Sequence, residues 1–74
     1  MTPNDILDLI QEMFENDGAP EGTIYEKWYA EAEEKLYGLK LIDEFGCFVE
    51  NVELRLFELG VDPDMGMKLI YNYL

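Results

Sequence analysis

Hydrophobic side chains recur with a helical period over the first part of the chain. Five of them follow the i, i+3, i+4, i+7, i+8 spacing of an amphipathic helix: Ile6, Leu9, Ile10, Met13 and Phe14. Thr2 can cap the start of this helix, with Pro3 in the first helical position and Asp5 where a capping box places an acid. The turn-forming residues 16–20 then stop the pattern. We therefore predict a helix over residues 3–16.

A second amphipathic stripe follows a second cap. Thr23 stands three residues before Glu26, the spacing of another capping box. The apolar positions that follow are Tyr25, Trp28, Tyr29, Ala32, Leu36 and Leu39. The stripe changes phase around Gly38. This pattern predicts a helix over residues 24–37.

The segment after Gly38 allows two interpretations. At about 100° per residue, most of its apolar side chains share one new helical face, which predicts a helix over residues 40–59. They are Leu41, Ile42, Phe45, Phe48, Val49, Val52, Leu56 and Leu59. The alternative is a short hairpin that pairs residues 39–42 with residues 47–49.

The last helical pattern begins after Gly60. Asp62 can act as an N-cap and Pro63 occupies the favoured first helical position. A final apolar stripe, Met67, Ile70, Tyr71 and Leu74, follows. We predict a helix over residues 63–73, and hence an all-α fold: a small bundle of three to four short helices, with residues 1–74 forming a single acidic domain.

Charge narrows the possible partners. The 74 residues carry 17 Asp and Glu against 5 Lys and Arg, a net charge of -12. Direct binding to nucleic acid or to an anionic membrane is not expected, because both require a basic surface. A hydrophobic content of 49% with 14% aromatic residues indicates a folded domain rather than an acidic disordered tail.

The chain lacks most of the residues that carry chemistry. It has no histidine, no serine and a single cysteine, Cys47, so a catalytic triad, a zinc site and an internal disulfide are excluded. A twelve-residue loop from Asp17 resembles a calcium-binding loop at Gly22, but Ala19 and Trp28 stand where ligands are needed. We expect no enzymatic activity, no cofactor and no bound metal.

No part of the sequence reads as a membrane span or a secretory signal. No apolar run reaches 18 residues, and the first five residues lack the basic segment of a signal peptide. We expect a cytoplasmic protein, in the host cytoplasm if a virus encodes it.

Acidic residues form a line on the first predicted helix. Four of them fall within an arc of about 80° when residues are placed at helical steps: Asp5, Asp8, Glu12 and Glu15. Three acids of the second helix extend the candidate surface: Glu26, Glu33 and Glu34. Neighbouring carboxylates on a helix stand about 5–6 Å apart, a density that can imitate a stretch of phosphates. The alternative is a solvated face that keeps the protein dissolved, which is usual for net charges of about -2 to -8.

In charge, length and helical pattern, the whole chain resembles the small acidic proteins that mimic nucleic acid. This functional class includes phage-encoded anti-restriction and anti-CRISPR inhibitors, and the resemblance assigns no residues. It implies a non-enzymatic inhibitor that occupies the basic nucleic-acid-binding surface of a target protein, such as a host defence nuclease complex.

A second hypothesis places binding on an apolar surface. Leu54, Phe57 and Tyr73 oppose the main stripes of the last two predicted helices. Such side chains are buried either by a central third helix packed on both sides, or by a partner protein or a second copy of the chain. In the latter case the protein is a helical adaptor or a small complex subunit, and a homodimer is possible.

Overall fold

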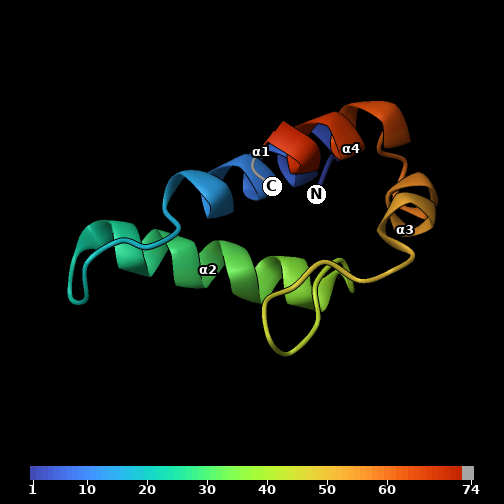
Figure 1. Ribbon diagram of the computed structural model, residues 1–74. Coiled ribbons are helices and arrows are strands. Elements are labelled where there is room, and N and C mark those ends of the chain that lie inside the picture. Colours follow the sequence, from blue (N-terminus) through green and yellow to red (C-terminus); the bar gives the residue numbers. More distant parts are fainter. Residues whose placement is uncertain (73–74) are drawn as a thin grey trace.

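Four helices follow one another in the part of the chain that the structure describes, and the longest connection, residues 39–51, joins the second helix to the third (Figure 1). The computed structural model describes residues 1–72, and Tyr73 and Leu74 lie outside the described residues. The helices are α1 (Pro3–Glu15), α2 (Ile24–Gly38), α3 (Val52–Glu58) and α4 (Pro63–Asn72). The all-α fold predicted from the sequence is confirmed. Within residues 1–72, no helix has both the length and the apolar character needed to cross a bilayer.

The first two helices begin where their capping residues predict. Thr2 and Asp5 form a complete capping box: the Asp5 amide donates to Oγ1 of Thr2 (3.2 Å), and the Thr2 amide donates to the Asp5 carboxylate (2.8 Å). At α2, the Glu26 amide donates to Oγ1 of Thr23 (3.2 Å), while the Glu26 carboxylate accepts from the amide of Gly22. These bonds satisfy amides that a helix leaves without internal partners.

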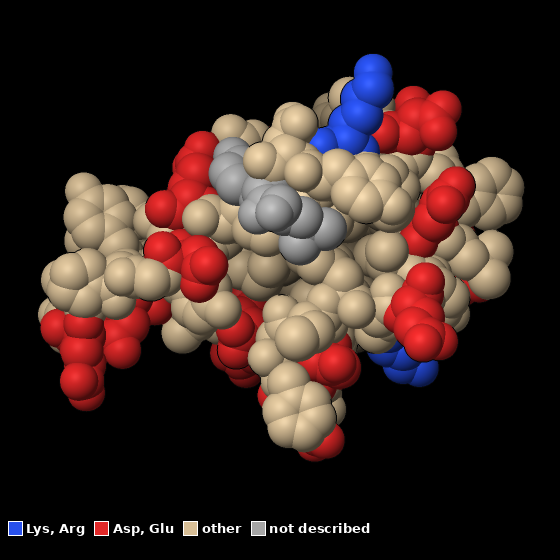
Figure 2. All heavy atoms as spheres, viewed as in Figure 1, with Lys and Arg blue, Asp and Glu red and all other residues tan. Residues whose placement is uncertain are grey.

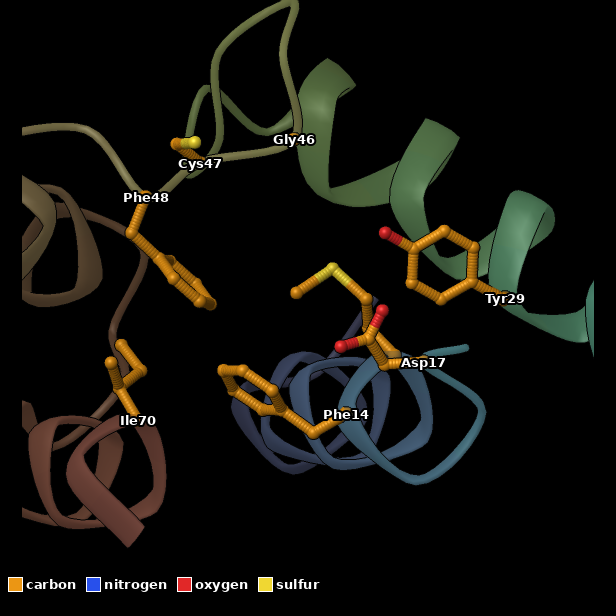
Figure 3. A pocket seen from close by; sticks show the side chains of 8 residues that line it. Phe14, Asp17, Tyr29, Gly46, Cys47, Phe48 and Ile70 are labelled. Atoms are coloured by element: carbon orange, nitrogen blue, oxygen red, sulfur yellow. The ribbon is translucent and has the colours of Figure 1, made fainter. Parts of the chain in front are cut away.

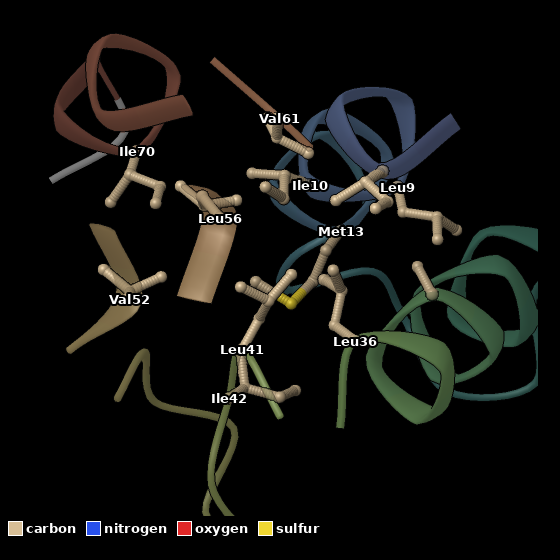
Figure 4. Packing of buried hydrophobic residues seen from close by; sticks show 12 residues of the cluster. Leu9, Ile10, Met13, Leu36, Leu41, Ile42, Val52, Leu56, Val61 and Ile70 are labelled. Carbon is tan, nitrogen blue, oxygen red and sulfur yellow. The ribbon is translucent and has the colours of Figure 1, made fainter. Parts of the chain in front are cut away.

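The core lies where α1 meets the other elements. Helix α1 packs against both α2 and α4, and α3 packs against α4 (Figure 1). Buried side chains from all four helices and from the connecting segments meet there (Figure 4). They are Ile6, Leu9, Ile10, Met13, Ala32, Leu36, Leu41, Ile42, Val52, Leu56, Val61 and Ile70.

The predicted helix over residues 40–59 is wrong over its first twelve residues. Residues 40–51 form turns, and α3 covers only Val52–Glu58. The alternative hairpin is closer to the structure, because Ile42 and Phe48 form an isolated antiparallel bridge. Asp43 stabilises the intervening turn, since its Oδ1 accepts from the amides of Phe45 (2.9 Å) and Cys47 (3.0 Å). Such side-chain bonds offer the backbone an alternative to the helix.

Helix α2 ends in a motif that its sequence does not indicate. Lys40 adopts a left-handed conformation (φ 63°), its amide donates to the carbonyl of Tyr37, and the Leu41 amide donates to that of Leu36 (3.1 Å). This is a Schellman motif, in which glycine usually holds the left-handed position. Helix α3 ends in the same way with Gly60 there. The left-handed turn at Lys40 therefore ends α2, and residues 41–51 do not continue the helix.

Candidate protein-binding surfaces

Three of the four α1 acids line one shallow depression. Asp5, Asp8 and Glu12 lie there together with Leu9 and with Lys35 of α2. Among the described residues, the carboxylates of Asp8 and Glu12 make no hydrogen bond and no ion pair. We call Asp5, Asp8 and Glu12 the α1 acid row; its last two members are available to an external partner.

Asp5 differs from the other two members of the row because it has a structural role. Its carboxylate accepts the capping bond from the Thr2 amide. Hydrogen bonds from the backbone and side chain of Thr2, together with the positive N-terminus, lower the pKa of Asp5. Replacing Asp5 would therefore perturb the start of α1 as well as any interface.

The fourth α1 acid lies beyond the row. Glu15 accepts a hydrogen bond from Nε2 of Gln11 (2.9 Å). It borders a depression formed by the turn after α1 and by Tyr25 of α2. The structure therefore separates Glu15 from the depression that contains Lys35.

The predicted acids of α2 do not continue the α1 acid row. Glu26 caps its own helix, and Glu33 and Glu34 line a different depression with Asp43 and Glu44. At about 100° per residue, Glu33 and Lys35 lie on opposite sides of the buried Leu36. The carboxylates visible in Figure 2 are accordingly spread over several parts of the surface, with other residues between them.

Most of the negative charge is uncompensated within the protein. Among residues 1–72, one salt bridge is present, between Nη1 of Arg55 and Oε2 of Glu58 (3.1 Å). Arg55 also donates from Nε to the carbonyl of Leu39 (2.8 Å), which ties α3 to the end of α2. Lys35 forms no salt bridge with another described residue.

Two of the three residues of the predicted apolar surface lie on α3. Leu54 and Phe57 lie one turn apart on α3 and are 55% and 68% exposed. Helix α3 is therefore not packed on both sides, and that interpretation of the sequence is wrong. Tyr73, the third residue of this predicted surface, lies outside the described residues. Exposed apolar side chains of this size can anchor a partner, although single ones are common on protein surfaces.

Sequence reasoning missed a cavity of about 390 Å³ between α1, α2, α4 and the turn at residues 46–48 (Figure 3). Its described lining residues are Met13, Phe14, Asp17, Tyr29, Gly46, Cys47, Phe48 and Ile70. The rings of Phe14 and Phe48 lie 5.6 Å apart between centroids, at 31° to each other. We call this cavity the junction pocket. No local pattern signals it, because its walls come from four separate segments.

Acidic groups surround the tyrosine of the junction pocket. A hydrogen bond to the Glu33 carboxylate raises the pKa of Tyr29 to about 12, with further contributions from burial and from the negative charges of Glu33 and Asp17. Glu33 also lies over the nearby turn, where a Cβ atom at position 46 would be 3.1 Å from its Oε2. Glu33 therefore places a negative charge beside two lining residues of this pocket, Tyr29 and Gly46.

Comparisons with known proteins leave the function open. Neither family models, nor curated proteins, nor solved structures gave a match.

Within residues 1–72, no three Cys, Asp or Glu side chains converge in a way that could hold a metal ion. The described residues also have no buried side-chain polar atom without a hydrogen-bond partner. The described surface presents free carboxylates, exposed apolar side chains and a pocket with both apolar and acidic residues. Features of this kind recognise other molecules.

Proposed function

We propose that this protein is a non-enzymatic inhibitor that binds the basic surface of a partner protein and excludes nucleic acid from it. The observation that carries the proposal is the lack of internal charge compensation: a net charge of -12, with a single salt bridge among the described residues. A field of this sign attracts basic surfaces and speeds encounter with them. It also repels nucleic acid itself.

The α1 acid row is the best-defined contact surface for such a partner. Asp8 and Glu12 lie one helical turn apart, line the same depression and have no partner among the described residues. Lys35 on the border of that depression is a weak competitor, because it forms no salt bridge with the row. A partner's Lys or Arg side chains can therefore pair with these carboxylates without first breaking internal bonds.

The test begins with capture of the partner from lysate of the source cells. Tagged protein is loaded with the lysate and eluted with a salt gradient, with duplex DNA added in a parallel sample. We expect a nucleic-acid-binding protein that is released by moderate salt and by DNA, because both compete for the same charges. A partner that resists both would contradict the proposal.

Variants of the captured complex then locate the surface. Asp8→Lys with Glu12→Lys should weaken binding by at least about tenfold, since two attractive contacts become repulsive. Glu21→Lys with Glu50→Lys is the matched control, because both glutamates are exposed, lie outside the α1 acid row and give the same change in charge. Equal losses in both variants would show a general charge effect and remove the assignment to the α1 acid row.

A second function is favoured by a separate observation, the exposure of Leu54 and Phe57 on α3. In this alternative the protein is an adaptor or small subunit that binds a partner, or a second copy of itself, through these side chains. Phe57→Asp should then abolish assembly, while moderate salt has little effect, since apolar contacts are not screened. Light scattering of the isolated protein and of Phe57→Asp distinguishes self-association from binding to another protein.

A further inference from the structure

The junction pocket combines apolar walls with an acidic border. Met13, Phe14, Phe48 and Ile70 supply the walls, and the Asp17 carboxylate stands over the Phe14 side (Figure 3). Its volume of about 390 Å³ falls within the usual range of ligand pockets, about 300–1,000 Å³. It can therefore hold one medium-sized side chain or small molecule.

The border of the pocket has an excess of negative charge. None of its described lining residues is basic. The side chain of Asp17 is exposed and forms no hydrogen bond or ion pair with another described residue. A second carboxylate, that of Glu33, accepts a hydrogen bond from the hydroxyl of the lining residue Tyr29. An occupant that complements this border carries positive charge.

The walls specify the rest of the occupant. A long side chain with a charged tip can pack its methylene stem against apolar walls while its charged group stays at the polar border. A carboxylate at the border matches the fork of guanidinium N–H donors. An apolar side chain in the same place would remove water from Asp17 without replacing its hydrogen bonds, which is unfavourable.

We propose that the junction pocket binds an arginine side chain of the partner protein, with the guanidinium at Asp17 and the aliphatic stem against the apolar walls. This inference rests on the proposed function, in which the partner presents a basic surface. It adds a second contact, because Asp17 and the pocket lie apart from the depression that holds Asp8 and Glu12. The α1 acid row then supplies charge attraction, and the pocket supplies selectivity for arginine.

The probe is a short peptide, acetyl-Gly-Arg-Gly-amide, titrated into the full ¹⁵N-labelled chain and followed by NMR. Its control is the same peptide with citrulline, which keeps the shape of arginine and lacks the charge. We expect the arginine peptide to shift the amides of Gly46, Cys47 and Asp17, and to bind at least about fivefold more tightly than the citrulline peptide. Equal binding of the two peptides would overturn the proposal.

Two variants with the same change in charge separate the pocket from the general acidity of the surface. Asp17→Asn should weaken binding of the arginine peptide by at least about threefold, because the charged acceptor is lost. Glu53→Gln, at an exposed acid of α3 that is not among the described lining residues of the pocket, should leave it unchanged. Neither side chain bonds to another described residue, so both variants are expected to fold, which circular dichroism checks. Equal losses in the two variants, or shifts concentrated at the α1 acid row, would refute the pocket assignment.

The two proposals can fail separately. If Asp8→Lys with Glu12→Lys weakens the partner complex while the peptide shows no preference for the pocket, the proposed function stands and the arginine site falls. If the peptide binds the pocket while the partner complex is indifferent to salt, the arginine site stands and the α1 acid row loses its role.

Discussion

The two halves of the chain acquire their order in different ways. Residues 3–38 consist mainly of two long helices of 13 and 15 residues, each started by a threonine cap. In the second half, α3 has 7 residues and its N-cap residue, Asn51, makes no side-chain capping bond. A helix this short is unstable alone, because nucleation costs more than a few hydrogen bonds return. The second half therefore depends on contacts distant in sequence.

Burial outside the helices shows what those contacts are. Leu41 and Ile42 lie in the turn segment and are 0% and 2% exposed. Val61, between α3 and α4, is buried as well. Local hydrogen bonds shape the turns, and these side chains attach them to the α1–α2 pair (Figure 4). The connecting segments of the second half are therefore part of the core.

The largest expected effect comes from breaking this attachment. Leu41→Ala should lower the free energy of unfolding by about 2–5 kcal/mol, as for other fully buried leucines. Leu36→Ala in α2 is the matched control, since both side chains are 0% exposed. Urea unfolding followed by circular dichroism measures both. Because so small a domain has only about 3–5 kcal/mol to lose, Ile42→Val, with an expected loss of about 0.5–1.5 kcal/mol, gives a graded version of the test.

A small loss of stability in Leu41→Ala would contradict this account of the second half. If Leu41→Ala cost less than about 1 kcal/mol while Leu36→Ala cost the full amount for a buried leucine, the turn segment would be a loosely attached loop. The stability of the second half would then have to come from α3 and α4 themselves.

The sequence predicts the parts of the fold that local chemistry determines. The helix starts at Thr2 and Thr23 follow from their capping spacing, and both are confirmed. The helix over 40–59 failed because a run of apolar residues fits a helical phase and a buried turn equally well. The deciding features are the left-handed Lys40 and the Asp43 turn. A left-handed conformation is uncommon for lysine, so the sequence gives no sign of it at residue 40.

The candidate surfaces were less predictable than the fold. Helical spacing correctly groups Asp5, Asp8 and Glu12, because they share one helix. Helical spacing cannot show that Glu33 of α2 lies on a different side of the molecule from these three acids, since that depends on how α1 and α2 pack. The junction pocket needs residues 46–48 beside α1, and the helix predicted over residues 40–59, which is wrong at residues 40–51, excluded that arrangement.

An intermediate effect is expected at the turn that forms one wall of the junction pocket. Gly46 has φ 78°, and a Cβ atom there would lie 3.1 Å from Oε2 of Glu33. Gly46→Ala should therefore cost about 1–2 kcal/mol of unfolding free energy. Gly38→Ala is the control and should have the opposite effect. Position 38 is helical and has open space around it, so we expect the free energy of unfolding to rise by up to about 1 kcal/mol. A neutral Gly46→Ala would show that the turn adapts and that local geometry does not limit the second half.

The smallest expected effect tests the junction between the halves. Lys40 holds a left-handed conformation that costs a side-chain-bearing residue about 1–2 kcal/mol, whereas glycine adopts it freely but loses more entropy on folding. Lys40→Gly should thus raise the free energy of unfolding by about 0.5–1 kcal/mol. Lys40→Ala removes the same charge and keeps the strain, so it should bring no gain. A gain in both variants would trace the effect to the lysine charge instead. A gain in Lys40→Gly alone would mean that burial of Leu41 and Ile42 holds residue 40 in the left-handed conformation that ends α2, against the local preference of the sequence.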